Sequence, residues 1–581
     1  MGVQDKDRNT KSAAAELFGN SRVRLWYGRF VIALSAASIH QVSTLPRAIL
    51  KQYSPFYMMH PCLSVPEIFA LICDCFTLSD RCHYRERSRN RKTLKSLTLC
   101  QRSFYDAALA TLWQDQPLTS LLRSLPPDVY KDGNKAQDFV VVRQITLHDI
   151  ERFTFYTALI RRLSTLNLRI DRSCLIALRD VCPQPLLPNL RFLLWKPSEA
   201  APVHLRSMLL APGLLCLELH LPATDEAMLM VPHLHESCPE IQEFALWPKR
   251  TGDEKVGGLG IASSLTRRWD NLTVFRVPHV NADDLPYLAS LPRLMKLAFG
   301  YCYGDSASVP SIPSPAFTAL QSLTINQERI EYSIALLRAL LPQSMKLNEL
   351  CLRWDEGSQA EWPALIAAIA HSCHHPSLKR LRLYDKGQSL SLEFADEYLP
   401  WPGALDFATM QPLASFSNLI ELSFICPRSY VLTDDDLQCL AEAWPLMESL
   451  HLRTESNHHS RRPQYLTARA LVDVAWLCPC LQRLSLDFDA STSGLDDVSL
   501  DLLAQSWLAN VHQHPLSWLN VGYSRISDAP AVVNLFSFVF PTLLHLVWYT
   551  NTRAQEYGGE DYLQEVARVS RWREVESEVE I

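Results

Sequence analysis

The stretch TDDDLQCLAEAWPLMESLHL, residues 433–452, decides the fold expected for this chain. Its apolar residues are Leu437, Leu440, Ala441 and Trp444 in the first half and Met447, Leu450 and Leu452 in the second. The first set is spaced at i, i+3, i+4 and i+7, which predicts a helix, and Thr433 before three aspartates is a suitable N-cap. The second set has the form LxxLxL, which predicts a short strand with its last two apolar residues on one face. The unit is a helix followed by a proline and a strand.

The LxxLxL pattern recurs along most of the chain, about every 29 residues on average. Its occurrences begin at Val142, Leu163, Leu190, Leu214, Ile241, Leu272, Leu294, Leu320, Leu347, Leu378, Leu419, Met447, Leu481, Leu516 and Leu543. No single unit of this size can bury its own apolar face, so neighbouring units must stack. We therefore expect fifteen parallel strands on the inside of an α/β solenoid, with helices on the outside.

The repeat resembles the leucine-rich-repeat family, particularly the long, cysteine-containing repeats of F-box receptors. Residues 433–452 match that subtype, with a Thr-Asp helix start followed by LxxLxL. The resemblance covers about 400 residues and implies a leucine-rich-repeat solenoid over residues 139–550. A charged segment, 551–581, follows it and is expected to form an amphipathic capping helix with Leu563, Val566 and Trp572 on its apolar side.

A helical module is expected before the repeats, over residues 59–127. Residues 63–76 read LSVPEIFALICDCF, where Pro66 suits a first helical turn and Glu67 suits the positive end of the helix dipole. Its apolar stripe is predicted to be Ile68, Leu71, Ile72 and Cys75. A second helix is predicted from Thr93 to Trp113, after a basic loop. Residues 1–58 remain an unassigned extension.

The strings LSVPEIFALI and LTLCQRSFYDAALATLW resemble an F-box, in the F-box-like form common in fungal proteins. The resemblance implies docking on the Skp-type adaptor of a cullin ubiquitin ligase. The residues that match positions forming or supporting the adaptor-binding surface are Leu63, Pro66, Glu67, Ile68, Ile72, Leu99, Cys100, Phe104 and Trp113. Val65 stands where leucine is usual, and residues 77–92 form an insertion. The alternative is a helical cap that binds no adaptor.

Composition excludes several classes of function. The 581 residues are 48% hydrophobic and 20% charged, as in ordinary globular proteins, and the net charge of −6 argues against a general grip on nucleic acid or an anionic membrane. Sixteen scattered cysteines favour a reducing compartment, and no phosphate-binding glycine motif occurs. We expect a cytoplasmic or nuclear protein with no membrane segment, no cofactor and no bound metal.

The inner face of the predicted sheet is the best candidate for binding a partner, because its side chains alternate with the buried leucines. The residues predicted to bind a protein substrate are Arg353, Arg380, Arg382, Tyr384, His451, Arg453, Arg483 and Trp518. Arginines and aromatic residues are frequent binding hot spots and suit an acidic or phosphorylated partner. The alternative is a solubilising face on which Glu349 and Asp487 pair some of the arginines.

Together, the resemblances to an F-box and to leucine-rich repeats imply the substrate-recognition subunit of a Skp/cullin/F-box ubiquitin ligase. No nucleophile, general base or metal-ligand set is recognisable, so we do not expect an enzyme and expect catalysis to occur elsewhere in the complex. The alternative is a leucine-rich scaffold or inhibitor that recruits no ligase.

Overall fold

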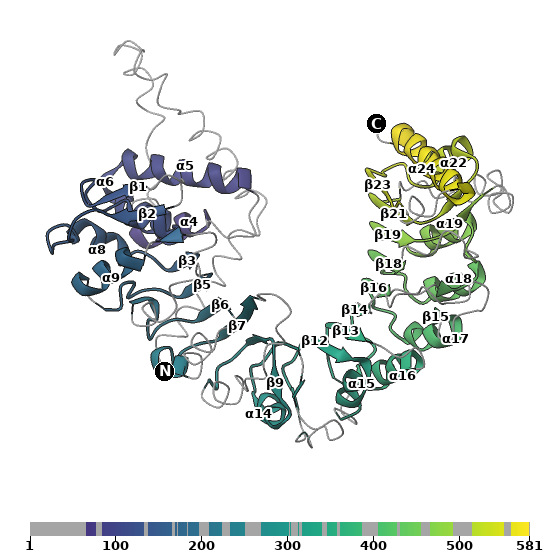
Figure 1. Ribbon diagram of the computed structural model, residues 1–581, viewed down its shortest axis with the longest axis horizontal. Helices are drawn as coiled ribbons and strands as arrows, with labels where there is room; N and C mark the ends of the chain where they lie inside the picture. Colours follow the sequence, from purple (N-terminus) through teal and green to yellow (C-terminus); the bar gives the residue numbers. More distant parts are fainter. Residues whose placement is uncertain are drawn as a thin grey trace, which may run out of the picture. The chain divides into compact units, whose positions relative to one another are not determined.

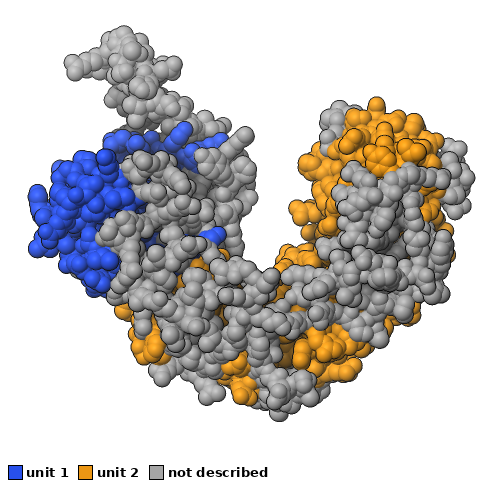
Figure 2. Space-filling model, in the orientation of Figure 1, with its two compact units in different colours: residues 1–211 blue, residues 212–581 orange. Residues whose placement is uncertain are grey.

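The computed structural model describes residues 65–76, 84–132, 138–164, 169–170, 172–182, 184–196, 208–222, 233–249, 269–300, 302–303, 312, 316–339, 345–356, 361–385, 405–426, 430–454, 465–491, 514–550 and 559–579. The chain divides into two compact units, residues 1–211 and 212–581 (Figure 2). A 14-stranded parallel sheet with accompanying helices dominates the fold, as expected for a solenoid.

Unit 1 begins with a small helical bundle. Its helices are α4 (Pro66–Asp74), α5 (Tyr84–Cys100), α6 (Arg102–Trp113), α7 (Leu118–Leu122), α8 (Glu151–Thr157) and α9 (Arg172–Val181). The core of the first three helices is apolar, with the rings of Phe69 and Phe104 stacked 4.0 Å apart beside Cys73 and Leu97. The core thus joins α4, α5 and α6.

Two predictions for this bundle are wrong. The buried residues of α4 are Phe69 and Cys73, followed by Phe76 just after the helix, whereas Ile68, Leu71 and the C-cap Cys75 are exposed. The helix is apolar on both sides, so periodicity could not distinguish the face that enters the core. The predicted helix from Thr93 to Trp113 is two helices, because Gln101 has an extended backbone (φ −154°, ψ 145°). The first of them begins at Tyr84, so part of the predicted basic loop is helical.

The strands of unit 1 correct the start of the repeat. They are β1 (Tyr130–Asp132), β2 (Asp138–Val141), β3 (Arg162–Ser164), β4 (Arg169–Ile170) and β5 (Phe192–Trp195). The predicted strand after Val142 is wrong, since β2 ends before it and belongs to a separate three-stranded sheet, β1-β2-β4. Leu163 pairs with Leu193, so it takes the second position of its motif and not the first.

Unit 2 supplies most of the large sheet. Its strands in this sheet are β6 (Cys216–Pro222), β7 (Glu243–Lys249), β8 (Val274–Val277), β10 (Lys296–Phe299), β12 (Ser322–Arg329), β13 (Glu349–Glu356), β14 (Arg380–Asp385), β16 (Glu421–Cys426), β18 (Ser449–Thr454), β19 (Arg483–Leu486), β21 (Trp518–Gly522) and β23 (His545–Trp548). Three parallel pairs of two-residue strands lie outside it: β9 (Val280–Asn281) with β11 (Cys302–Tyr303), β15 (Leu405–Asp406) with β17 (Tyr430–Val431), and β20 (Asp489–Ala490) with β22 (Arg525–Ile526). The predicted motifs from Leu190 onward all coincide with strands of the large sheet.

Leucine columns run across the strands and form the core of unit 2. Leu350 pairs in register with Leu323 and Leu381, and the same column continues through Leu422 and Leu450. All five are at most 2% exposed. Burial of each side chain contributes about 1.5–3 kcal/mol, and the columns therefore stabilise every junction between repeats.

The helices of unit 2 lie on its outer side, while the strands line its inner side (Figure 1). They are α12 (Leu234–Ser237), η5 (Ala282–Asp284), α14 (Leu285–Ser290), α15 (Ile330–Ala339), α16 (Trp362–Ser372), α17 (Phe407–Met410), η7 (Gln411–Ser415), α18 (Asp434–Glu442), α19 (Ala468–Leu477), α22 (Ala529–Val539) and α24 (Gly559–Val579). The predicted N-cap Thr433 is confirmed, since it forms a capping box with Asp436, and Thr467 caps α19. The Thr467 backbone N–H and hydroxyl also donate to Asp434, at 2.8 and 2.6 Å, which links the two repeats. No helix in the described ranges is both long and apolar enough to cross a membrane.

The charged C-terminal segment forms α24, which packs against α22 and β22. Its buried side differs from the prediction. Trp572 is buried as expected and donates from Nε1 to the Ser524 carbonyl at 3.0 Å, but Leu563 and Val566 are exposed. Glu565 and Arg568 are buried instead and form an ion pair at 2.7 Å. Arg568 also donates to the carbonyl oxygen of Tyr549, so charged residues attach this helix to the last repeat.

The buried ion pair generates a stability prediction. Arg568→Met leaves the Glu565 carboxylate buried without its cation and should lower the free energy of opening of α24 by about 3–5 kcal/mol. Adding Glu565→Gln removes the stranded charge and should recover part of this loss. Hydrogen exchange of peptides from 559–579 measures both effects. Equal losses in the single and double variants would show that the ion pair does not control the docking of this helix.

Candidate protein-binding surfaces

The inner face of unit 2 is formed by strand residues that alternate with the leucine columns. The eight residues predicted to bind a substrate all occupy such positions on β13, β14, β18, β19 and β21. Arg353, Arg380 and Arg483 are exposed, and the other five are partly exposed. The structure therefore places the predicted residues on one face, although it divides them into groups with different partners.

Arg382 is held between two carboxylates. Its Nε and Nη2 donate to Glu421 at 2.6 and 2.8 Å, and its Nη1 donates to Glu349 at 2.8 Å. Arg380 lies 3.7 Å from Glu421 in a weaker contact. The predicted alternative was correct for one arginine: Glu349 does pair with Arg382, and this guanidinium is not available to an incoming anion.

The hydrogen bonds between Arg382 and Glu421 shift the pKa values of both side chains. Burial alone would raise the pKa of Glu421, but the hydrogen bonds and charge of Arg382 outweigh it, so the pKa is lowered. The same hydrogen bonds raise the pKa of Arg382. Arg382 and Glu421 are therefore both charged at neutral pH.

His451 on β18 and Trp518 on β21 form an aromatic pair across β19. Their rings meet edge to face with centroids 5.5 Å apart, and the Ser449 hydroxyl lies 2.9 Å from His451 Nε2. Burial lowers the pKa of His451 despite the opposing charge of Glu421. The histidine is therefore neutral at pH 7 and contributes an aromatic surface, not a positive charge.

Two arginines lie over tyrosine rings. The guanidinium carbon of Arg353 is 4.8 Å from the ring centroid of Tyr384, and that of Arg453 is 4.5 Å from the centroid of Tyr549. Asn520 fixes the second ring by donating to the Tyr549 hydroxyl at 2.8 Å. Neither guanidinium has an ion-pair partner among the described residues, which distinguishes both from Arg382.

The exposed side of α4 is a second candidate surface. Ile68 and Leu71 are 39% and 45% exposed beside Val65, and Leu99 at the end of α5 is 73% exposed. Of the other predicted adaptor-binding residues, Pro66, Glu67 and Cys100 are exposed, Ile72 is partly buried, Phe104 lies in the core, and Trp113 stacks on Tyr156 at 3.9 Å. Leu63 lies outside the described residues.

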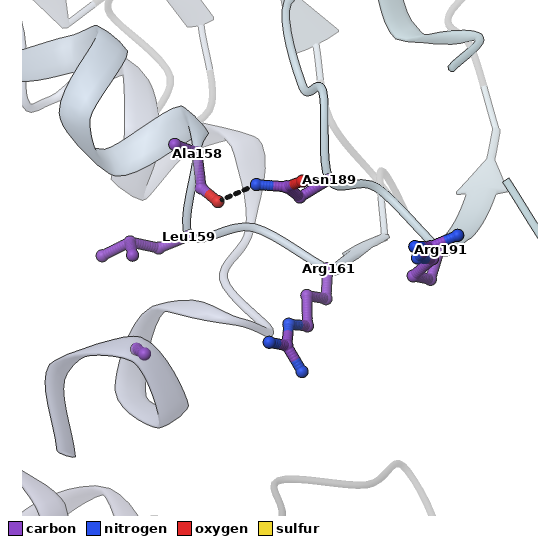
Figure 3. A pocket seen from close by; sticks show the side chains of 6 residues that line it. Ala158, Leu159, Arg161, Asn189 and Arg191 are labelled. Carbon is purple, nitrogen blue, oxygen red and sulfur yellow. Dashed lines mark hydrogen bonds between the residues drawn. The ribbon is translucent and has the colours of Figure 1, made fainter. Parts of the chain in front are cut away.

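Unit 1 also contains a cavity of about 360 Å³ lined by Ala110, Ala158, Leu159, Arg161, Asn189 and Arg191 (Figure 3). The two arginines precede the paired residues Arg162 and Phe192 of β3 and β5. Asn189 closes one side by donating to the Ala158 carbonyl at 2.8 Å. No sequence motif predicts this cavity, because its wall comes from the ends of separate elements.

Sequence analysis missed Glu421 as part of the chemistry of the inner face. Glu421 occupies the same motif position as Glu349 and Arg380. Aligning the motifs column by column would have identified it, but the alignment does not predict which neighbour it contacts. Within the described ranges, no group of three or more His, Cys, Asp or Glu side chains is arranged to hold a metal ion.

Comparisons with known proteins add little. No family model matches the chain, and no curated protein matches it. Among solved structures, it is similar to the crystal structure of the Rad7 and Elc1 complex in yeast. The similarity has 13% sequence identity and a TM-score of 0.33, and covers 55% of this chain and 72% of that one.

The Arg382 cluster generates a prediction with a pH dependence. Arg382→Gln removes the charge-assisted hydrogen bonds of Glu421 and should lower stability at pH 7 by about 1–3 kcal/mol. Because the folded protein lowers the pKa of Glu421, its contribution exists above the ordinary value of 4.5 and is lost as the pH falls through the lowered value. The difference in unfolding temperature between parent and variant should therefore shrink below pH 4.5.

Thermal unfolding at pH 7 and at acidic pH measures this difference. Arg338→Gln, an exposed arginine on the outer helix α15, is the matched control and should change neither value. A parent-to-variant difference that is the same at both pH values would contradict the role assigned to Glu421.

Proposed function

We propose that this chain is the substrate-recognition subunit of a Skp/cullin/F-box type ubiquitin ligase. In this proposal, α4 to α6 dock a Skp-type adaptor, and the inner face of unit 2 holds a protein substrate. The receptor itself performs no chemistry. It raises the effective concentration of the substrate near a ubiquitin-conjugating enzyme and orients it, so no nucleophile of its own is required.

The observation that carries the proposal is the double-sided character of α4. Phe69, Cys73 and Phe76 already fill the core of the bundle, yet Ile68 and Leu71 are apolar and exposed. A helix that is apolar beyond the needs of its own core is typical of a protein-binding surface. The exposed residues belong to the string LSVPEIFALI, which resembles an F-box. Because F-boxes bind Skp-type adaptors, this resemblance indicates such an adaptor as the partner.

The inner face supports the second half of the proposal. It presents arginines and aromatic side chains on paired parallel strands, whose backbone hydrogen bonds hold those side chains in fixed rows. Arginine and aromatic residues dominate binding energy at many protein interfaces, the aromatic rings through large contact areas at little conformational cost and arginine through paired, charge-assisted hydrogen bonds. A partner protein is therefore the ligand class that this face suits best.

The test is a pull-down of the full chain with a purified Skp-type adaptor. Ile68→Asp with Leu71→Asp places charges on the exposed side of α4 without touching its core and should abolish adaptor binding. Leu147→Asp is the matched control, since Leu147 is a 73% exposed leucine of unit 1 outside α4, and it should leave binding intact.

Adaptor binding that survives in the double aspartate variant would show that α4 is not the docking helix. No binding by the parent chain, with its fold confirmed by circular dichroism, would favour the scaffold or inhibitor that recruits no ligase.

A further inference from the structure

Four inner-face residues form one continuous row across neighbouring strands. Arg353 pairs with Tyr384, Tyr384 with Ile425, and Ile425 with Arg453. We call these four residues the arginine row. Both of its ends are cationic, and both middle residues have an apolar or aromatic surface that is partly exposed. The row therefore has a cation at each end and an apolar stretch between them, along a line perpendicular to the strands.

The arginines at the ends are prepared to bind anions. Each guanidinium lies against a tyrosine ring, Arg353 on Tyr384 and Arg453 on Tyr549, which restricts the side chain without neutralising its charge. Arg453 Nε is buried and has no hydrogen-bond partner in the described part of the chain. Asp487, the carboxylate that follows β19, accepts a hydrogen bond from the Tyr523 backbone N–H at 3.2 Å.

The length of the row selects the spacing of its ligand. Strands in a sheet lie about 4.8 Å apart, so three steps separate the backbone positions of Arg353 and Arg453 by about 14 Å. An extended chain advances about 3.3 Å per residue, and its alternate side chains point to the same side. Residues i and i+4 of such a chain are therefore about 13 Å apart on one side, which matches the two ends. Residue i+2 then lies over Tyr384 and Ile425.

We propose that the arginine row binds an extended protein segment with two carboxylate side chains four residues apart and an apolar residue midway between them. This inference rests on the proposed function, because it specifies the substrate segment that the inner face would hold. Carboxylates are favoured over phosphates because each end of the row offers a single arginine, which can bind one carboxylate through two hydrogen bonds. Phosphoryl groups are usually bound by clusters of arginines.

Charge on this face supports an acidic protein segment and not a nucleic acid. Glu349 and Glu421 line the same face next to the row and pair with Arg382 and Arg380, so this cluster offers no net positive charge to a continuous phosphate backbone. A segment with only two charges can place them at the ends and avoid the glutamates. The net charge of the chain, −6, provides no general attraction for nucleic acid either.

The experiment is fluorescence anisotropy of the full chain with labelled synthetic peptides. The probe peptide contains Glu-Ser-Leu-Ser-Glu between glycine-serine flanks. Comparison peptides replace both glutamates with glutamine, both with lysine, both with phosphoserine, or the leucine with serine, and one moves the glutamates to adjacent positions. A single-stranded thymidine oligomer tests the nucleic-acid alternative.

The parent protein should bind the probe peptide at least about tenfold more tightly than each comparison ligand. Arg353→Gln and Arg453→Gln should each weaken binding of the probe by about tenfold. Arg338→Gln with Arg573→Gln is the control for two lost charges, because both residues are exposed on helices α15 and α24 away from the inner face, and it should have no effect.

Several results would overturn the inference: equal affinity for the glutamate and glutamine peptides, equal affinity for the two spacings, tighter binding of the phosphoserine peptide or the oligomer, or no peptide binding at all. The peptide comparisons use the parent protein and do not depend on the folding of a variant. The assay contains no adaptor, so it is separate from the ligase proposal. The Ile68→Asp, Leu71→Asp protein should bind the probe normally, and loss of adaptor binding alone would leave the inference intact.

Discussion

The structure depends on the register of its parallel strands. A carbonyl just before each strand accepts two N–H groups from the next repeat: Asn348 accepts from Lys379 and Arg380, and Lys379 in turn accepts from Ile420 and Glu421. This repeated contact aligns the leucine columns. Because side chains alternate between faces, a slip of one residue would expose the leucines and bury the arginines of the inner face. The register is therefore fixed at once by hydrogen bonds, by burial of apolar surface and by the desolvation cost of charge.

The same register determines the chemistry of the inner face. Residues that are far apart in sequence become neighbours in rows, and the identity of the neighbour decides what an arginine can do. Arg382 has glutamates on both sides and is neutralised by them. Arg353, in the adjacent row, meets a tyrosine and keeps its charge available. Two arginines on the same face of the sheet, one row apart, therefore differ in the availability of their charge because of residues contributed by other repeats.

The spacing of leucines predicts the strands because it reflects a local property, the two-residue period of a pleated strand that is buried on one side. Where apolar residues are numerous, the spacing alone does not decide the register of a motif or the buried side of a helix. Leu163 begins one plausible motif and occupies the second position of another, and only its pairing with Leu193 decides between them. In α4 both sides are apolar, and in α24 the buried side contains Glu565 and Arg568. Periodicity assumes that charge marks the solvent side, and a buried ion pair breaks that assumption.

The two candidate surfaces differ in the kind of selectivity that they provide. The exposed side of α4 is apolar, and its attraction for a partner is proportional to buried area and largely independent of direction. The arginine row has two charges at a fixed separation, and its attraction depends on where the partner carries its own charges. An apolar surface suits one constant partner of complementary shape, whereas separated charges discriminate among many segments of similar shape. The proposed joining of a common adaptor to a selected substrate would use one surface of each kind.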